Sequence, residues 1–310
     1  MTKSKKYNLI LTFLSIFLIL LALPKIFINS KGKNIKSMES ALLNTKYVNQ
    51  INSIYLGDSV DSLHFSKQND TWVCSYGDFS FYADSKIISD LISNFSKKIT
   101  LIKVSSNYKD LKNYGLEESN AFNISFYNED LAGNKTEYSS IYFGIENSDR
   151  TMIYIRNNRK PDVYTMKNFL YPYLSTKLEK FGNMNLFPII DENVESTIEQ
   201  IEITEYIDGN PVKTIKRLGD NNFSSDVHTF FSLRGSTLYT NDILQNSNMK
   251  KVKNIKAINS KNNFYILEIY SYTNSIGDEQ FFVKSDFPNK NSQCNYVLEI
   301  SEWTKSRFDF

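Results

Sequence analysis

The first thirty residues of the chain combine basic and apolar positions in the order of a membrane-targeting segment. Three lysines precede an apolar run from Leu9 to Leu23, which only two hydroxyl residues interrupt. The stretch from Tyr7 to Ile28 would form about 33 Å of helix at about 1.5 Å per residue, which is enough to cross a bilayer. The pattern therefore predicts a short N-terminal tail and a membrane anchor in residues 1–33.

The sequence around this run favours an uncleaved, single-pass anchor. No small-x-small pair follows it, so cleavage near Ser30 is the weaker alternative, and no Cys lies near it, which excludes acylation as a lipoprotein. A buried core helix is the third alternative. Lysines lie on both sides of the run, so the positive-inside rule does not decide orientation. We expect the N-terminus inside a bacterial cytoplasmic membrane and the main domain outside the cytoplasm, in the periplasm or on the cell surface.

Behind the anchor, short alternating segments recur in two halves of the chain, which predicts an internal repeat. The opening strands are expected at residues 48–54, 63–65 and 72–74, and again at 198–203, 212–218 and around Phe223. Asp84 is the expected N-cap of a helix in the first half. Its apolar face consists of Ile87, Ile88, Leu91, Ile92 and Phe95. The corresponding helix of the second half is expected to be shorter, near residues 241–245.

Each half is predicted to end in a β meander, with polar turns at residues 128–136, 146–150 and 274–278. The meander strands are expected at residues 121–127, 140–144, 152–155 and 163–164, and then at 264–270, 280–283 and 296–300. A helical connector, residues 166–181, is interrupted by Pro172. We therefore predict an α+β fold, in which an N-terminal transmembrane helix precedes two related, mainly antiparallel β modules with short helices. The expected boundaries are 1–33 for tail and anchor, 45–166 for the first module, 167–195 for the connector and 196–310 for the second module.

The first half contains the sequence signature of a helix C-terminus. Residues 108–113 read as a short helix, and Gly115 falls at the left-handed C′ position. Leu116 then falls at C″ and Leu111 at C3, which is the hydrophobic pair of a Schellman motif. We expect this turn to end the helix and to lead into the strand that starts near Ala121.

With these residues in place, the chain resembles an uncharacterised bacterial domain-of-unknown-function family with one N-terminal membrane anchor. The family pattern is a polar turn that leads into a Trp-bearing strand, a helix, and a Tyr-Gly-Leu turn before a β meander. Its counterparts here are residues 69–72, residues 84–95 and Tyr114-Gly115-Leu116. The resemblance covers residues 51–187 well and the second half loosely. A proline usual after the Tyr-Gly-Leu turn is replaced here by residues 117–120.

Members of this family are often encoded beside genes for ABC-type transporters akin to the gliding-motility export system. The resemblance therefore implies a role on the outer side of such a transporter, with its permease and ATPase subunits as partners. It implies no catalytic residue, because none is established for the family.

Composition narrows the classes of partner. The chain has 36 basic and 34 acidic residues, but six of the lysines and no acid lie in residues 1–33, so the rest has a net charge of −4. This balance disfavours a nucleic-acid partner. The lysines at positions 250, 251 and 253 are expected to form a solvated face. Cys74 and Cys294 fall in different halves, so we expect two free thiols rather than a disulfide, although an exported chain could pair them.

The sequence offers no clear catalytic, cofactor-binding or metal-binding site. His64 and His228 are the two histidines, and both are expected to be structural. The turn at residues 57–61 and the acidic pairs at 117–118 and 129–130 fit solvated turns better than a cation site or a pair of catalytic acids. Zinc, nucleophile-elbow and phosphate-loop motifs are absent, and Ser106 with Lys109 is a chance Ser-x-x-Lys spacing.

Aromatic residues make up 14% of the chain, and Tyr and Phe could line a sugar- or peptide-binding groove, although strand cores use the same residues. Residues 264–270 read as a strand that is apolar on both faces, either central in the fold or part of an interaction surface. We expect a non-enzymatic, membrane-anchored accessory or binding module that acts with an ABC-type transporter and needs no cofactor. Its small-molecule ligand is unknown. The alternatives are a structural cell-envelope protein and an extracytoplasmic hydrolase.

Overall fold

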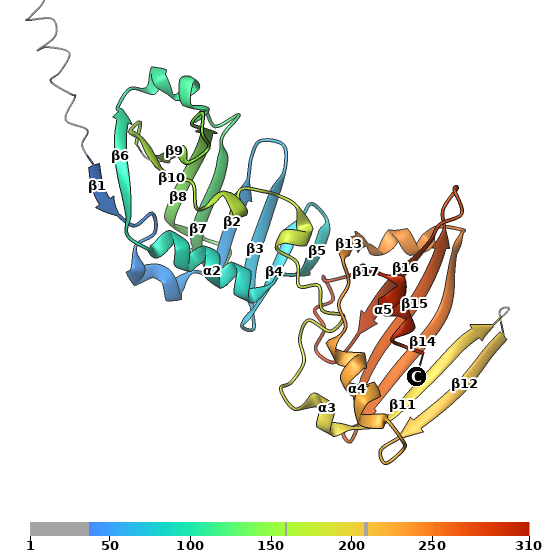
Figure 1. Ribbon diagram of the computed structural model, residues 1–310. Helices are drawn as coiled ribbons and strands as arrows, with labels where there is room; N and C mark the ends of the chain where they lie inside the picture. Colours follow the sequence, from blue (N-terminus) through green and yellow to red (C-terminus); the bar gives the residue numbers. More distant parts are fainter. Residues whose placement is uncertain (1–36, 159, 208–209, 310) are drawn as a thin grey trace, which may run out of the picture.

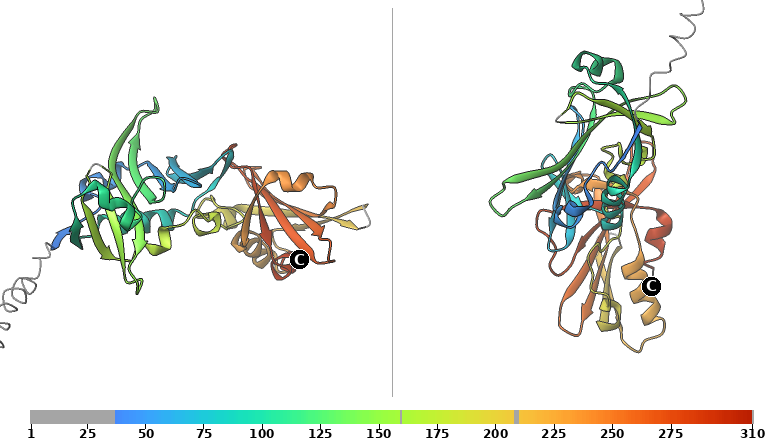
Figure 2. Two further views of the ribbon diagram at one scale, coloured as in Figure 1. Left: turned by 90° about the horizontal axis from the view of Figure 1, so that it is seen from above. Right: turned by 90° about the vertical axis from the view of Figure 1, so that its left-hand side faces the viewer.

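The computed structural model of the protein describes residues 37–158, 160–207 and 210–309 (Figure 1). These residues form two β-sheets, of ten and seven strands, with a few short helices. Figure 2 shows the two sheets at opposite ends of an elongated molecule. The predicted anchor lies outside the described residues. Among the helices that are described, none combines the length and the apolar character that a bilayer crossing requires.

The first sheet has the order β1-β6-β10-β9-β8-β7-β2-β3-β4-β5, and its neighbouring strands are antiparallel. Its strands are β1 (Ser37–Ser40), β2 (Ser53–Gly57), β3 (Ser62–Gln68), β4 (Thr71–Tyr76), β5 (Phe79–Tyr82), β6 (Ile99–Ser105), β7 (Phe122–Glu129), β8 (Lys135–Glu146), β9 (Met152–Asn157) and β10 (Val163–Lys167). Two 3-10 helices, η1 (Thr45–Gln50) and η2 (Tyr108–Tyr114), lie between them.

Helix α2 (Ser85–Ser96) covers one face of this sheet, as its periodicity predicts. The Asp84 side chain caps it by accepting hydrogen bonds from the backbone N–H groups of Lys86 and Ile87. Phe95 packs edge-on against Phe126 of β7 at a ring-centroid distance of 4.9 Å. The predicted N-cap and the predicted apolar face are thus both confirmed.

The second sheet has the order β12-β11-β14-β15-β16-β17-β13 and is also antiparallel. Its strands are β11 (Ile198–Ile207), β12 (Asn210–Arg217), β13 (Thr237–Thr240), β14 (Met249–Asn259), β15 (Phe264–Thr273), β16 (Glu279–Asp286) and β17 (Tyr296–Ile300). Its helices are α3 (Val194–Thr197), α4 (Phe223–Ser232), η5 (Asn241–Gln245) and α5 (Glu302–Ser306). Helix α4 packs on this sheet through Phe231, whose ring lies 5.2 Å from that of Tyr265.

The strand order of the second sheet repeats a contiguous part of the first. Read from β13, the second sheet runs β13-β17-β16-β15-β14-β11-β12, and the first contains β6-β10-β9-β8-β7-β2-β3. The two series agree strand for strand in chain order, and α4 takes the place of α2. Three strands of the first sheet, β1, β4 and β5, have no counterpart in the described part of the second.

Three predicted elements differ from the structure in type or position. Residues 48–50 belong to η1, and the strand begins only at Ser53. Phe223 was expected in a strand but starts α4, because its partners Val227, Phe230 and Phe231 recur at helical spacing and are buried. Residues 241–245 are helical and form η5, but they are not the counterpart of α2. That counterpart is α4, which precedes η5 in the chain.

Two further differences concern β14, which was not predicted, and the connector. The sequence prediction missed β14 because polar and basic residues alternate with its buried positions. Residues 166–181 of the connector hold no α-helix, and α3 begins only at Val194. They form two single turns, η3 (Tyr171–Tyr173) and η4 (Leu178–Lys180), and Pro172 lies in the first.

The expectation of a strand that is apolar on both faces also needs correction. Strand β15 is central, between β14 and β16, but only one of its faces is buried. Tyr265, Leu267 and Ile269 point into the core, whereas Phe264 is exposed. Buried and less buried positions therefore alternate along β15, as in an antiparallel strand with one face in the core. The sequence did not show this alternation, because several outward-facing residues are also apolar.

The connector joins the two sheets by backbone hydrogen bonds to both. Asp84 N–H donates to the Phe181 carbonyl at 2.7 Å, and Asn183 N–H donates to the Tyr82 carbonyl at 2.8 Å. On the other side, Gly235 N–H donates to the Met184 carbonyl at 2.8 Å. One hydrophobic core runs through both modules, so the sheets are packed together rather than merely tethered.

The Tyr-Gly-Leu turn has the predicted Schellman geometry. Gly115 has φ 66° and ψ 28°, and its N–H donates to the Lys112 carbonyl. Leu116 N–H donates to the Leu111 carbonyl at 2.9 Å, and both leucine side chains are buried together. This turn ends η2 and directs the chain toward β7.

Candidate functional site

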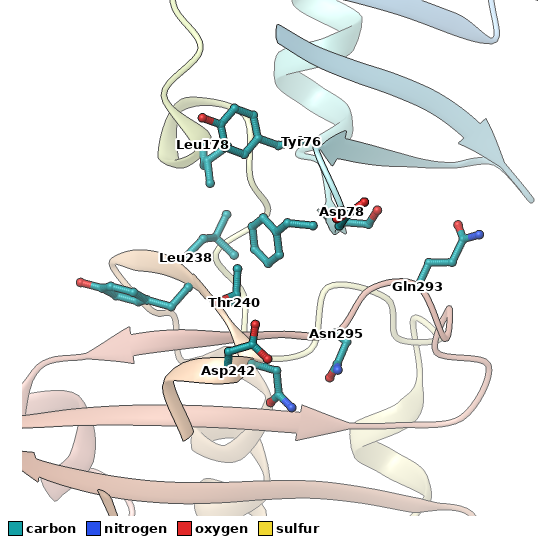
Figure 3. Close-up of a pocket in the computed structure, with 12 residues that line it drawn as sticks. Tyr76, Asp78, Leu178, Leu238, Thr240, Asp242, Gln293 and Asn295 are labelled. Carbon is teal, nitrogen blue, oxygen red and sulfur yellow. The ribbon is translucent and has the colours of Figure 1, made fainter. Parts of the chain in front are cut away.

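The candidate site is a groove of about 630 Å³ between the two modules (Figure 3). Its first wall is the hairpin of β4 and β5, which contributes Tyr76, Asp78, Phe79 and Ser80. Gly77 has φ 57° and is the first of the two residues between paired Tyr76 and Phe79, as in a type II′ turn. This local turn chemistry places Asp78 at the rim of the junction.

The second wall comes from the other module. Strand β13 pairs with β17 and leads directly into η5, so that Tyr239, Thr240 and Asp242 line the groove. Tyr239 donates a hydrogen bond from its hydroxyl to Glu299 Oε2 at 3.0 Å, which fixes its ring. Figure 3 shows Thr240, Asp242 and Asn295 across the space from Asp78.

Two acidic side chains line the groove. Asp78 and Asp242 are both exposed to solvent, and neither forms a salt bridge with another described residue, although Asp242 accepts a hydrogen bond from Gln245 at 3.3 Å. No lysine, arginine or histidine is among the lining residues. Aromatic rings, hydroxyls and amides complete the wall. Such a mixture of apolar surface and a few convergent polar groups at a domain junction is typical of a ligand site.

One polar atom of the groove lacks a partner. Asn241 lines the groove, and its side-chain oxygen is buried without a hydrogen bond to any described residue. A buried acceptor without a donor is costly, and this oxygen is closed to solvent within the wall of the groove.

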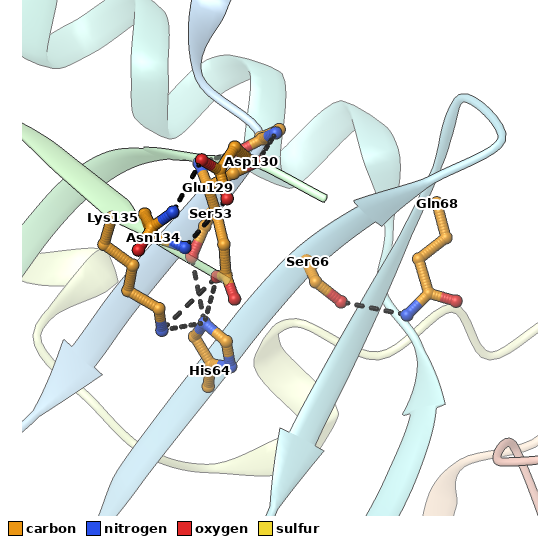
Figure 4. Close-up of polar contacts among 9 residues, drawn as sticks. Ser53, His64, Ser66, Gln68, Glu129, Asp130, Asn134 and Lys135 are labelled. Atoms are coloured by element: carbon orange, nitrogen blue, oxygen red, sulfur yellow. Dashed lines mark hydrogen bonds and ion pairs between the residues drawn. The ribbon is translucent and has the colours of Figure 1, made fainter. Parts of the chain in front are cut away.

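A second polar cluster surrounds His64 on β3 (Figure 4). His64 Nε2 lies 2.9 Å from Ser53 Oγ, 3.4 Å from Lys135 Nζ and 3.9 Å from Glu129 Oε2. Burial and the charge of Lys135 lower the pKa of His64, while Glu129 opposes this shift.

This cluster does not have the geometry of a hydrolytic triad. A triad histidine contacts its nucleophile with one ring nitrogen and its carboxylate with the other. Here Ser53 and Glu129 both face Nε2, and Ser53 is fully buried. The arrangement instead joins β2, β3 and the β7–β8 hairpin by polar contacts.

His228 belongs to a separate environment. It lies on α4, where its Nδ1 is 3.1 Å from Glu195 Oε2, and its side chain is 69% exposed. The contacts of the two histidines therefore lie in different modules, and neither histidine lines the groove.

Two acids of the turns found in the sequence, Asp58 and Glu118, have partners within the protein. Asp58 accepts hydrogen bonds from the N–H groups of Val60 and Asp61, within the β2–β3 turn. Glu118 pairs with Arg156 at 3.3 Å. Among the residues that the structure describes, no cluster of His, Cys, Asp or Glu has the composition to hold a metal ion.

Cys74 and Cys294 are free and fully buried. Burial, together with the charge that Cys294 would carry, raises the pKa of Cys74, and burial raises the pKa of Cys294 to about 12. Both thiols are therefore poor nucleophiles in the folded protein.

Sequence reasoning raised an aromatic groove only as a minor alternative and named none of its residues. Its walls come from segments around positions 78, 178, 240 and 294, which no local pattern connects. The one available signal was the Tyr-Gly-Asp-Phe stretch at 76–79, which fits a tight hairpin between two strands.

Fold and site define an antiparallel β protein of two packed sheets with a groove at their junction. The chain belongs to the family described as Domain of unknown function (DUF4340), whose model matches residues 72–257. This finding agrees with the predicted resemblance to an uncharacterised family, and it extends farther into the second module than expected. None of the curated proteins and none of the solved structures matches the chain.

Proposed function

We propose that this protein is a non-enzymatic binding module and that the groove between the sheets is its ligand site. The observation that carries the proposal is the composition of the groove. It offers aromatic, hydroxyl, amide and carboxylate groups from both modules, and its serine, Ser80, lies 3.1 Å from the Ser75 hydroxyl rather than beside a histidine or lysine that could activate it. The polar cluster that does contain a histidine has its serine buried away from any ligand.

We further propose the finer features that the sequence predicts: a single membrane anchor, a location outside the cytoplasm and an accessory role beside an ABC-type transporter. The apolar run at residues 9–23 supports the anchor, and the family resemblance supports the transporter. The shared strand order of the two sheets supports an origin by duplication of one module.

Co-purification tests the accessory role. The full-length protein, tagged at its C-terminus and extracted from its native membrane in a mild detergent, should retain the permease and ATPase subunits of one transporter. An Asp90→Asn variant, altered on the exposed side of α2, serves as a control for surface charge. Loss of both subunits under several mild detergents would overturn the transporter role but would leave the groove as a binding site.

A further inference from the structure

We infer that strand β12 is a self-association surface, on which the β12 strand of a second copy of this chain pairs in antiparallel orientation. Strand β12 is one edge of the second sheet, and β11 is its one neighbour in the sheet order of the described chain (Figure 1). Seven of its eight residues are exposed. The inference does not depend on the groove, which is lined by β13 at the other edge of this sheet.

The repeated architecture shows what such an edge carries when it is covered. The counterpart of β12 in the first sheet is β3, and β4 pairs antiparallel with the outer edge of β3. Leu63 and Phe65 of β3 are fully buried, whereas Val212 and Ile215 of β12 are 48% and 43% exposed. In the described part of the second module no strand takes the place of β4. An open strand edge with apolar side chains is a template for pairing with another chain.

The direction of the backbone groups of β12 follows from one hydrogen bond at its end. Leu218 N–H donates to the Glu199 carbonyl of β11 at 2.9 Å, so the backbone of this residue faces β11. Successive residues of an antiparallel strand direct their N–H and C=O groups to opposite sides. The backbone groups of residues 211, 213, 215 and 217 therefore point to the free edge.

Both ends of this free edge are closed, and its centre is open. The Arg217 N–H donates to the Asp220 carboxylate at 2.7 Å, and the Arg217 carbonyl accepts from the Asp220 N–H at 3.0 Å. Pro211 has no N–H to offer. The donors that remain for a partner strand are the N–H groups of Lys213 and Ile215.

This pattern is symmetric about Thr214, so a second β12 is complementary to it. When two copies pair antiparallel with Thr214 opposite Thr214, Lys213 of each copy lies opposite Ile215 of the other. Each such pair exchanges two backbone hydrogen bonds, which uses both free N–H groups of each copy. The same register brings Pro211 opposite Arg217, and neither of these positions has a free donor. No N–H on the edge is left without a partner.

The side-chain charges of β12 also permit this pairing. Lys213 is paired with Glu202 at 3.0 Å, and Lys216 is paired with Asp226 at 2.7 Å, so both positive charges are compensated within the chain. In the symmetric register each of these lysines lies opposite an aliphatic residue of the other copy, and no two basic side chains are directly opposite. Their methylene stems would cover the aliphatic residues on both faces of the joined sheet.

Sedimentation velocity of the full-length protein in a mild, uncharged detergent tests self-association. We expect dimers to appear as the protein concentration rises to about 100 µM, where interfaces of modest size are populated. Ile215→Lys should weaken dimerisation about tenfold, because it places two pairs of lysines directly opposite each other. Ile276→Lys is the matched control, since Ile276 is 79% exposed in the turn between β15 and β16, and it should leave the dimer unchanged.

Cysteine cross-linking tests the register. Thr214→Cys places two thiols in a directly opposed pair whose Cα atoms lie about 4.5 Å apart, a separation that a disulfide bridges. Lys213→Cys places its two thiols on a diagonal of about 7–8 Å, which is too long to bridge without backbone movement. Oxidation by copper phenanthroline should therefore cross-link Thr214→Cys much faster than Lys213→Cys. The unaltered chain is the background control, because Cys74 and Cys294 are buried.

Three results would overturn the inference. A monomer at every concentration would leave the edge to a strand of a different protein. A dimer that Ile215→Lys does not weaken would be formed by another surface. Equal cross-linking of the two cysteine variants would reveal random collision instead of a fixed register. Thermal unfolding shows whether each variant is folded, and the cysteine pair decides the matter if Ile215→Lys is not.

Discussion

Lys253 is buried, although the lysines that surround it in the sequence predicted an exposed position. It was expected on a solvated basic face, yet it is only 5% exposed. Its ammonium group pairs with Glu205 at 2.8 Å and Asp309 at 2.7 Å, and it donates to the Phe308 carbonyl at 2.9 Å. The partners lie about fifty residues away on either side, so the local run of lysines could not reveal that this one is buried and paired.

His64 is the residue whose protonation should affect stability. Its pKa is lowered in the folded protein, so near-neutral pH the unfolded chain binds more protons than the folded one. The corresponding stability is fully present above the ordinary pKa of 6.5 and is lost as pH falls through that value toward the lowered one. We predict that His64→Gln makes the decline of unfolding free energy between about pH 7 and pH 5 shallower.

Urea unfolding at several pH values measures this slope. His228→Gln, which removes the exposed imidazole on α4, is the matched control. An unchanged slope in His64→Gln would contradict the assigned role of Lys135 and burial at His64. Only slopes are compared, because the substitution also removes the contact to Ser53.

At the scale of elements, the sequence correctly predicted those features that depend on residues close together in the chain. The α2 cap, the Tyr-Gly-Leu stop and the meander turns each depend on residues within a few positions of one another. It failed at α4, although Val227, Phe230 and Phe231 recur at helical spacing, and at β14, where tertiary packing overrides the local pattern. Strand β14 buries Lys253 and Asn259 beside Ile255, so its inward face does not look apolar.

The Tyr-Gly-Leu stop makes Gly115 a testable position. We predict that Gly115→Ala lowers the unfolding free energy by more than the roughly 1–2 kcal/mol that a left-handed residue costs an L-amino acid. The added Cβ would also lie 2.8 Å from Ile145 Cγ2 on β8, so the Ile145 side chain would have to move.

Gly133→Ala separates the two causes of this loss. Gly133 also has positive φ, at 84°, but a Cβ there meets nothing within 4 Å. Chemical denaturation should therefore show a smaller loss for Gly133→Ala than for Gly115→Ala. Equal losses would mean that contact with β8 contributes nothing.

At the scale of the whole molecule, the junction between modules was beyond sequence reasoning. The Tyr82 hydroxyl accepts a hydrogen bond from Asn291 N–H at 2.5 Å, across 209 positions of the chain. Its ring also lies 6.1 Å from Phe287. These contacts depend on how the two sheets pack against each other. The alternation of residues along each strand would be the same if the sheets did not touch, so it carries no information about this packing. The groove forms at this junction, so it could not be predicted either.

The buried thiols report on the integrity of the whole molecule. We predict that neither Cys74 nor Cys294 reacts with Ellman's reagent at about pH 8 in the native protein, since burial raises both pKa values and limits access. Unfolding in urea should release both thiols together. Single Cys→Ser variants identify each signal, and rapid reaction of either thiol without denaturant would show that its module opens independently.

The hairpin of β4 and β5 has a consequence for stoichiometry. The two sheets share seven strands in the same order, yet this hairpin occurs only in the first sheet of the described chain. A simple doubled protein would offer two equivalent sites and bind two ligands. Here the additional hairpin faces the second module and forms one wall of the groove, so the groove needs residues from both modules. Titration should therefore reach saturation at one ligand per chain, despite the repeated architecture.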